Sequence, residues 1–223
     1  VNNITPKPNH RYQNIQFVST ADGNIASDML LFYGWKPTAN NGVGYFWQAN
    51  TTNNLAKEQL IAWCIVPFDA KKRGPAERVE MLKRLGLNRV AYDWRAQHVN
   101  EFEEEILEYK KHGMEFFAFW SVHEEAFRLF KKHKIHPQIW QTLPNPKADV
   151  REAQVAATAK AMLPLVERTK KLGCKLGLYN HGGWGGEPAN LVAVCKYLRE
   201  HHKAMHVGIV YNLHHGHGHI ADF

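Results

Sequence analysis

A unit made of a helix, a short apolar run and a polar end recurs between residues 61 and 212. Each helix ends in a basic residue, often with glycine soon after it. Clear copies of the junction are Arg84–Asp93, Lys111–Trp120 and Lys171–Asn180, and degraded copies are Lys132–Trp140 and His202–Asn212. Glycine after a basic helix end stops the helix, and a short apolar run bounded in this way is typical of a strand buried on both faces. The pattern therefore predicts alternating helices and strands.

This pattern predicts a parallel sheet. The expected strands are Ile61–Phe68, Arg89–Asp93, Glu115–Trp120, Pro137–Trp140, Lys175–Asn180 and Val207–Asn212. Amphipathic helices are expected over 76–85, 99–111, 150–172 and 188–200, with a kink at Pro164. A doubly wound sheet and a (β/α)8 TIM barrel both have this element order. Polar residues after nearly every strand, and the lack of a glycine-rich phosphate loop after the first, favour the barrel.

About six βα units leave a (β/α)8 barrel incomplete. We expect a partial barrel over residues 58–223 and a β-rich or irregular segment, frequent in Asn, Thr and Gly, over residues 1–57. The barrel then has two bare edges, at the strands that begin near Ile61 and Val207. Exposed edges invite pairing, which predicts self-association unless residues before 58, another chain or a missing C-terminal barrel segment covers them.

Composition excludes several classes of protein. The chain has 223 residues, of which 44% are hydrophobic and 22% charged, and this excludes a disordered tail, a collagen-like fibre and a disulfide-stapled miniprotein. No apolar run approaches the roughly 20 residues that span a bilayer, so no membrane partner is expected. The cysteines Cys64, Cys174 and Cys195 adjoin apolar stretches and are expected to be buried free thiols. Free thiols favour a cytoplasmic location, although the compartment stays open.

The basic residues behind the net charge of +7 are scattered, and they include four lysine pairs. These pairs are Lys71–Lys72, Lys110–Lys111, Lys131–Lys132 and Lys170–Lys171, and we interpret them as basic helix ends that complement the helix dipole. No arginine-rich stripe interleaves with aromatic residues, as a nucleic-acid groove requires. We therefore expect no nucleic-acid partner.

The polar residues that follow the strands predict a binding site at one end of the barrel. In a parallel barrel, the carboxyl ends of the strands and the loops after them meet at a single mouth. Asp69 follows the first expected strand. The candidate substrate-binding residues are Asp93, Arg95, Trp120, Trp140, Asn180, Trp184, Asn212 and His217. Tryptophan stacks on the apolar face of a sugar, while Asp, Arg, Asn and His bind its hydroxyl groups, so the expected partner is a sugar or sugar derivative.

The candidate catalytic residues lie in two loops of the C-terminal third, where eight of the fourteen histidines fall between His181 and His219. We expect His181, Glu187 and His215 to be catalytic. Four glycines in the loop at 182–186 let the backbone approach a ligand, with His181 and Trp184 facing it. The imidazoles at 214–219 suit metal binding, proton transfer or hydrogen bonding to sugar hydroxyls.

Four segments resemble the xylose-isomerase-like barrel superfamily. They are Ala62–Asp69, Ala91–Arg95, Gly177–Pro188 and Val207–His217, and within the superfamily they are similar to a branch of sugar phosphate isomerases and epimerases. The resemblance covers residues 58–223 and implies a (β/α)8 barrel that acts on a sugar, often with a divalent metal at the strand ends. The better-known epimerases have a metal-binding Glu after the fifth strand and an Asp after the sixth. Here those regions offer Asn180–His181 and Asn212, with His215 three residues on.

The primary hypothesis is a sugar isomerase or epimerase-like enzyme that moves a proton next to a sugar carbonyl. His181 and His215 would carry protons or share a divalent metal, for which imidazole and amide donors favour Mn, Co, Ni or Zn. The second hypothesis is a non-catalytic carbohydrate-binding barrel, because two of the family's carboxylates are absent. The third is a metal-dependent endonuclease of the same superfamily, which requires several carboxylate ligands and a basic groove that the sequence does not show.

Overall fold

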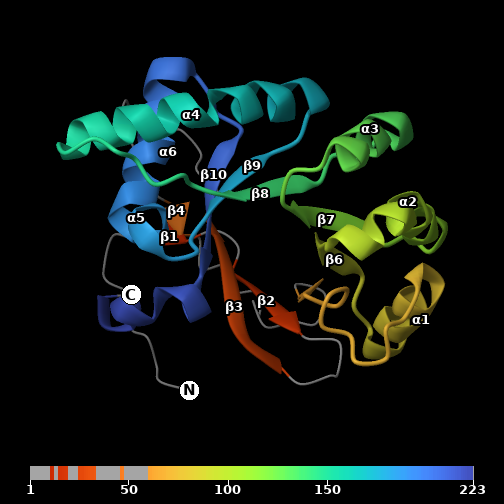
Figure 1. Ribbon diagram of the computed structural model, residues 1–223. Helices are drawn as coiled ribbons and strands as arrows, with labels where there is room; N and C mark the ends of the chain where they lie inside the picture. The colour runs from red at the N-terminus through yellow and green to blue at the C-terminus, as the bar shows by residue number, and fades with distance from the viewer. Residues whose placement is uncertain (1–10, 13–14, 20–24, 34–45, 48–59, 223) are drawn as a thin grey trace.

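A computed structural model describes residues 11–12, 15–19, 25–33, 46–47 and 60–222. Side chains are described from residue 60 onward, except those of His217 and of the residues from Ile220 to the end. In this part of the chain, a curled sheet of parallel strands is surrounded by helices (Figure 1). The expected α/β alternation is confirmed.

Six parallel strands follow one another around the sheet in chain order. They are β5 (Ile61–Trp63), β6 (Arg89–Asp93), β7 (Glu115–Trp120), β8 (Gln138–Thr142), β9 (Leu176–Tyr179) and β10 (Val207–Asn212). Each predicted strand is present, and β6, β7 and β10 have the predicted bounds. The prediction for the first strand was too long, because the backbone turns at Cys64 into the left-handed region with φ of 57°.

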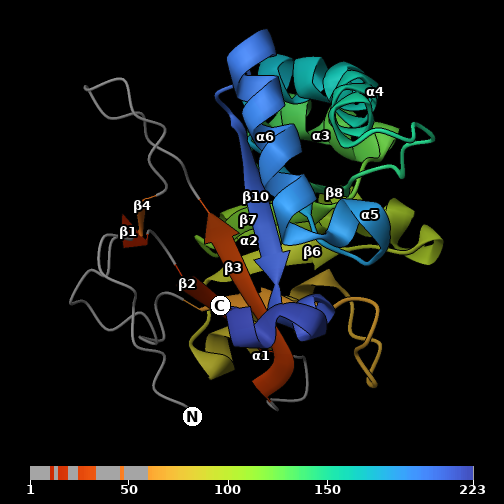
Figure 2. The same cartoon turned by 90° about the vertical axis from the view of Figure 1, so that its left-hand side faces the viewer.

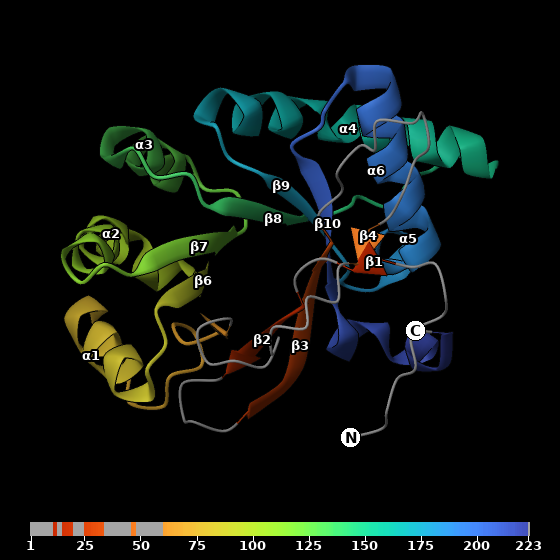
Figure 3. The same cartoon turned by 180° about the vertical axis from the view of Figure 1, so that it is seen from behind.

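Two strands from the N-terminal segment close the sheet. β2 (Ile15–Ser19) pairs in parallel with β5, while β3 (Ile25–Tyr33) pairs antiparallel with β2 and β10. The order around the closed barrel is β10–β3–β2–β5–β6–β7–β8–β9. Figures 2 and 3 show β3 running beside β10. Residues before 58 therefore cover both of the edges left by the six βα units, which was one of the expected alternatives. β1 (Arg11–Tyr12) and β4 (Phe46–Trp47) form a separate two-stranded sheet.

Helices cover the outer face of the parallel strands (Figure 1). They are α1 (Pro75–Leu85), α2 (Phe102–Lys111), α3 (Glu124–His133), α4 (Arg151–Leu172), the short α5 (Gly183–Gly186) and α6 (Pro188–His202), with 3-10 turns η2 (Ala96–Glu101) and η3 (Leu213–Asp222). Pro164 lies inside α4 and does not end it. Among the described residues, no helix combines the length and the apolar character that crossing a membrane requires.

The lysine pairs occupy helix ends with one exception. The pairs that begin at Lys110, Lys131 and Lys170 lie in the last turns of α2, α3 and α4, where they complement the negative end of the helix dipole. The interpretation of Lys71–Lys72 as a helix end is wrong, because these residues lie in the loop that precedes α1. The side chain of Asp69 organises that loop.

The sheet separates two hydrophobic cores, because successive strand residues point to opposite faces. The inner core consists of Ile61, Trp63, Ala91, Ala118, Trp140, Tyr179 and Val210. The larger outer core lies between the sheet and the helices and contains residues of alternate register, such as Ala62, Tyr92 and Phe119. The inner core fills the barrel with bulky side chains, as in other small parallel barrels.

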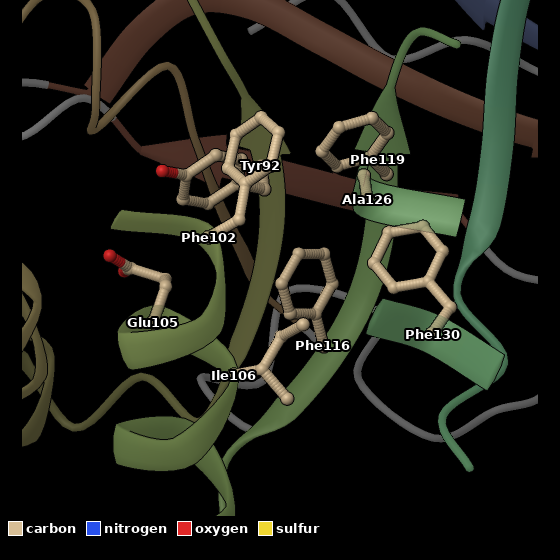
Figure 4. A pocket seen from close by; sticks show the side chains of 8 residues that line it. All are labelled: Tyr92, Phe102, Glu105, Ile106, Phe116, Phe119, Ala126 and Phe130. Carbon is tan, nitrogen blue, oxygen red and sulfur yellow. The ribbon is translucent and has the colours of Figure 1, made fainter. Parts of the chain in front are cut away.

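The outer core contains a small apolar pocket between β6, β7, α2 and α3 (Figure 4). Seven of its lining side chains are uncharged, and the eighth, Glu105, is fully buried. Arg78 on α1 is also buried, and its Nε donates to both Glu105 oxygens at 3.2 and 3.1 Å. Arg78 donates further to Glu101, at 2.8 Å, and to the carbonyl oxygen of Arg73. A buried ion pair is tolerated only when its hydrogen-bonding groups are satisfied, and the bonds of this pair link α1 to α2.

We expect Gly177→Ala to destabilise the protein by about 1–3 kcal/mol, the usual cost of overpacking a core. A Cβ at position 177 would lie 2.5 Å from Cγ2 of Val210 and 2.9 Å from Cδ1 of Trp140. The measurement is the free energy of unfolding in urea. Gly218→Ala is the matched control, since a Cβ there meets no atom within 4 Å. Equal stabilities of the two variants would contradict the tight interior packing.

Candidate active site

Four aromatic side chains close the barrel below its mouth. We call Trp63, Trp120, Trp140 and Tyr179 the aromatic floor. Tyr179 is central to it, with its ring centroid 5.9 Å from Trp63, 4.2 Å from Trp120 and 6.2 Å from Trp140. Trp140 is 2% exposed and its indole N–H donates to Gln138, so it lies within the filled interior. Trp120 is half-buried at the end of β7. Trp120 and Trp140 are two of the three tryptophans expected to bind substrate, and Trp120 is the more accessible of these two.

The two histidines expected at the mouth lie side by side. His181 follows β9, His215 follows β10, and their ring centroids are 4.3 Å apart. Tyr179 lies 6.4 Å from the first ring and 6.0 Å from the second, and Trp120 lies 6.1 Å from His181. The two rings are therefore adjacent, as expected for residues that follow neighbouring strands, and their sharing of one ligand stays a prediction. We call them the imidazole pair.

The asparagines expected to flank the imidazole pair bind the protein itself. The Asn180 amide donates to the carbonyl oxygen of Asn212 at 2.9 Å and accepts from its backbone N–H at 2.5 Å. The Asn212 amide donates to the Tyr179 hydroxyl at 2.7 Å, while its oxygen accepts from the backbone of His214 at 2.8 Å. Both asparagines are fully buried. This asparagine clamp ties the ends of β9 and β10 together and so positions the residues that follow them.

The glycine-rich loop brings His181 to the mouth but directs Trp184 elsewhere. Gly182 and Gly183 have φ angles of 72° and 63°, which glycine adopts without strain. Gly185 packs so closely on Leu143 that a Cβ would lie 2.8 Å from it. The Trp184 indole donates to Gln154 of α4 at 2.8 Å and packs against the outer core. Trp184 therefore lies with the helices, apart from the aromatic floor.

Glu187 caps the start of α6 at the far side of this loop. Its carboxylate is exposed and lies 2.8 Å from Nε2 of His219. None of the described contacts joins Glu187 to the imidazole pair. The side chain of His217 lies outside the described residues, so its expected contact with substrate stays a prediction.

A second polar cluster lies at the ends of β5 and β6. Asp93 is 4% exposed and accepts from Arg95 at 2.6 Å and from the Cys64 thiol at 3.7 Å. Burial raises the pKa of Asp93, although hydrogen bonds from Arg95 and Cys64 act to lower it. The Arg95 guanidinium lies 5.6 Å from the ring centroid of the exposed Phe68. The sequence predicts a buried thiol at Cys64, but the side chain is half-buried, and its place beside a strand-end aspartate is not evident from the sequence.

Asp69 serves the loop between β5 and α1. Its buried carboxylate accepts from the backbone N–H groups of Lys71 at 3.0 Å and Arg73 at 2.9 Å, and from the Arg73 guanidinium at 2.6 Å. Burial acts to raise the pKa of Asp69, but these hydrogen bonds and the Arg73 charge outweigh it and hold the pKa below its usual value. These hydrogen bonds explain why the Asp69 carboxylate is buried, without any role in binding a ligand.

The described residues bring together fewer ligating side chains than a resident catalytic metal commonly uses. Such a site commonly uses three protein ligands, and no group of three His, Cys, Asp or Glu side chains that could hold a metal comes together in the described part of the chain. The amide oxygens of Asn180 and Asn212 already accept backbone hydrogen bonds. A metal shared by His181 and His215 stays a prediction, and no step below depends on it.

We expect Asp69→Asn to lower the free energy of unfolding at pH 7 by about 1.5–3 kcal/mol, the usual range for hydrogen bonds to a charged group. Because the folded state lowers the pKa of Asp69, its contribution is present above the unfolded-state pKa and is lost as the pH falls through the folded-state pKa. Urea denaturation at pH 7 and below pH 3 measures this, with the exposed Asp149→Asn as control. A stability difference that persists unchanged at the lower pH would contradict this role.

Comparison with known proteins identifies no family for this chain. The sequence matches no protein-family model, and no curated protein is similar to it at a significant level. The resemblance to the xylose-isomerase-like superfamily therefore rests on the four segments that carry it.

Proposed function

We propose that this protein is a sugar isomerase or epimerase-like enzyme that moves a proton on the carbon next to a sugar carbonyl. The observation that carries the proposal is the imidazole pair, with ring centroids 4.3 Å apart, beside the aromatic floor. Histidine titrates near neutral pH, so one ring accepts a proton while its neighbour, in the protonated form, donates one. The expected substrate is a keto- or aldo-sugar or a derivative of one.

The chemistry needs a base and a group that stabilises the enolate. A carbon acid next to a carbonyl is weak, so the negative charge that develops on the carbonyl oxygen must be met by a hydrogen-bond donor. A neutral His181 takes the proton, and a protonated His215 donates to the oxygen. His181 is the exposed member of the pair, which favours it as the group that meets the carbon. Their roles exchange in the reverse direction.

The surroundings of the imidazole pair support sugar binding. Trp120 is half-buried beside Tyr179 and His181, and an indole of this kind stacks on the C–H face of a sugar. The asparagine clamp orders the backbone on both sides of the pair, which reduces the cost of aligning the two rings. Non-catalytic carbohydrate binding remains the second candidate, because the aromatic floor serves binding without chemistry and the family's two carboxylates are replaced by Asn180 and Asn212.

We expect His181→Gln and His215→Gln each to lower the rate of proton exchange at the sugar carbon by about 10²–10⁴-fold, the usual contribution of a general acid or base. The measurement is deuterium incorporation from D₂O into a panel of keto- and aldo-sugars, followed by NMR. His201→Gln is the control, since His201 is exposed at the end of α6 and contacts Tyr197.

Two further measurements separate the alternatives. Sugar binding measured by tryptophan fluorescence, without any exchange in the parent protein, would contradict the enzyme and support the carbohydrate-binding alternative. The exchange assay repeated with EDTA and with added Mn²⁺ or Zn²⁺ tests the predicted metal. Exchange that survives EDTA assigns the chemistry to the protein's own side chains, without a metal.

A further inference from the structure

A thiol and a carboxyl group face the mouth on the side away from the imidazole pair. Sγ of Cys64 lies 3.7 Å from Oδ2 of Asp93, at the ends of β5 and β6. Asp93 follows the inner-core residue Ala91 by two positions, so its side chain points to the same face of the sheet. Cys64 packs against the same inner core. We call Cys64 and Asp93 the thiol–carboxyl pair.

The topology sets the two pairs opposite each other. Around the eight-stranded barrel, β5 is four places from β9 and β6 is four places from β10 in either direction. The ring contact of 5.9 Å between Trp63 on β5 and Tyr179 on β9 crosses the interior and confirms that these strands face each other. Cys64 is next to Trp63, and His181 follows Tyr179 by two residues. A ligand resting on the aromatic floor therefore has one pair on each side.

The backbone at Cys64 is strained in a way that serves this arrangement. In a regular strand, Cys64 would point away from Trp63 into the outer core. With φ of 57°, Cys64 adopts a conformation that costs a non-glycine residue energy, and it joins Trp63 at the inner core. A glycine would relieve the strain but would remove the thiol. Strain retained at a strand end is a feature of functional sites.

A separate observation on this side is an unpaired hydrogen-bond donor. The Trp63 side chain is 6% exposed, and its indole N–H has no hydrogen-bond partner in the described part of the protein. An unpaired buried donor is costly, and a ligand hydroxyl or carbonyl oxygen would satisfy it. Trp63 lies in the aromatic floor, next to Cys64 in the chain and in ring contact with Tyr179.

We propose that Cys64 is a second proton carrier, with Asp93 as its relay, and that the site inverts the configuration of one carbon next to the sugar carbonyl. This inference rests on the proposed function and narrows it from isomerisation or epimerisation to epimerisation. Two proton carriers on opposite faces of one carbon perform an inversion, whereas a single carrier returns the proton to the face it left. The substrate class is a keto- or aldo-sugar with a stereocentre at the α-carbon.

The proposed step balances without an oxidant or a metal. His181 takes the proton from the α-carbon, and the electron pair of that C–H bond moves to the carbonyl oxygen. The electron pair returns to the α-carbon when that carbon takes the proton of Cys64 on its opposite face. A negative carboxylate beside the sulfur favours the protonated thiol, which is the form that donates. Asp93 then relays a proton from solvent to the thiolate, and His181 loses its proton to solvent.

The test separates exchange from inversion. His181 deprotonates one of the two substrate epimers. For Cys64→Ala and Cys64→Ser, we expect the rate of deuterium exchange at the α-carbon of that epimer to stay within about threefold of the parent rate. Formation of the other epimer should fall by at least about 100-fold. Cys64→Ser keeps a hydroxyl donor for Asp93 and so preserves the fold, which a thermal melt verifies. Cys195→Ala is the matched control, because Cys195 on α6 is buried against β10 and burial raises its pKa.

Each outcome decides one question. A parent protein that exchanges no α-proton with any sugar would overturn the proposed function itself. A parent that exchanges, with Cys64 variants that form the epimer at the parental rate, would overturn only the role of Cys64. A parent protein that interconverts a ketose and an aldose but forms no epimer would also overturn the role of Cys64. Trp63→Phe, which keeps the ring and removes the N–H, should raise KM about tenfold and leave kcat unchanged if its donor meets the substrate.

Discussion

The packing around Tyr179 is the interaction on which the rest of the site depends. Its ring lies between 4.2 and 6.4 Å from those of Trp63, Trp120, Trp140, His181 and His215. Aromatic pairs at these distances contribute about 0.5–1.5 kcal/mol each beyond the burial of their surface. Its hydroxyl accepts from Asn212, which links the interior to the asparagine clamp. One side chain thus joins the filled barrel to the groups that meet a ligand.

The carboxylates at this end of the barrel are engaged by other groups. Asp69 holds its own loop, Asp93 is bound by Arg95, and Glu187 lies beside His219. The groups left to exchange protons with a ligand are imidazoles and, by our inference, a thiol. Imidazole ordinarily titrates near neutral pH and a thiol somewhat above it, in contrast to an exposed carboxylate, which is a weak base at neutral pH. The loss of the family's two strand-end carboxylates is therefore compatible with proton transfer by other side chains.

The sequence predicted the helices and strands well where local signals were complete. A glycine or basic helix end, a short apolar run and a polar residue together determined the bounds of β6, β7 and β10. The prediction failed at Cys64, because an apolar run continued past the point where the backbone turned. It was also silent on the closing hairpin, since the pairing of β2 with β5 and of β3 with β10 depends on contacts between residues far apart in the chain.

By itself, the sequence determined the parallel order of the strands, the positions of their polar ends and the proximity of His181 to His215, because each follows from periodicity and from the geometry of adjacent parallel strands. Only the tertiary structure decided how those side chains are used. Asn180 and Asn212 bond to each other's strands, and Trp184 turns to Gln154. Cys64 meets Asp93 across 29 residues of chain. Side-chain direction depends on which partners surround a residue in space, and that information becomes available only when the barrel closes.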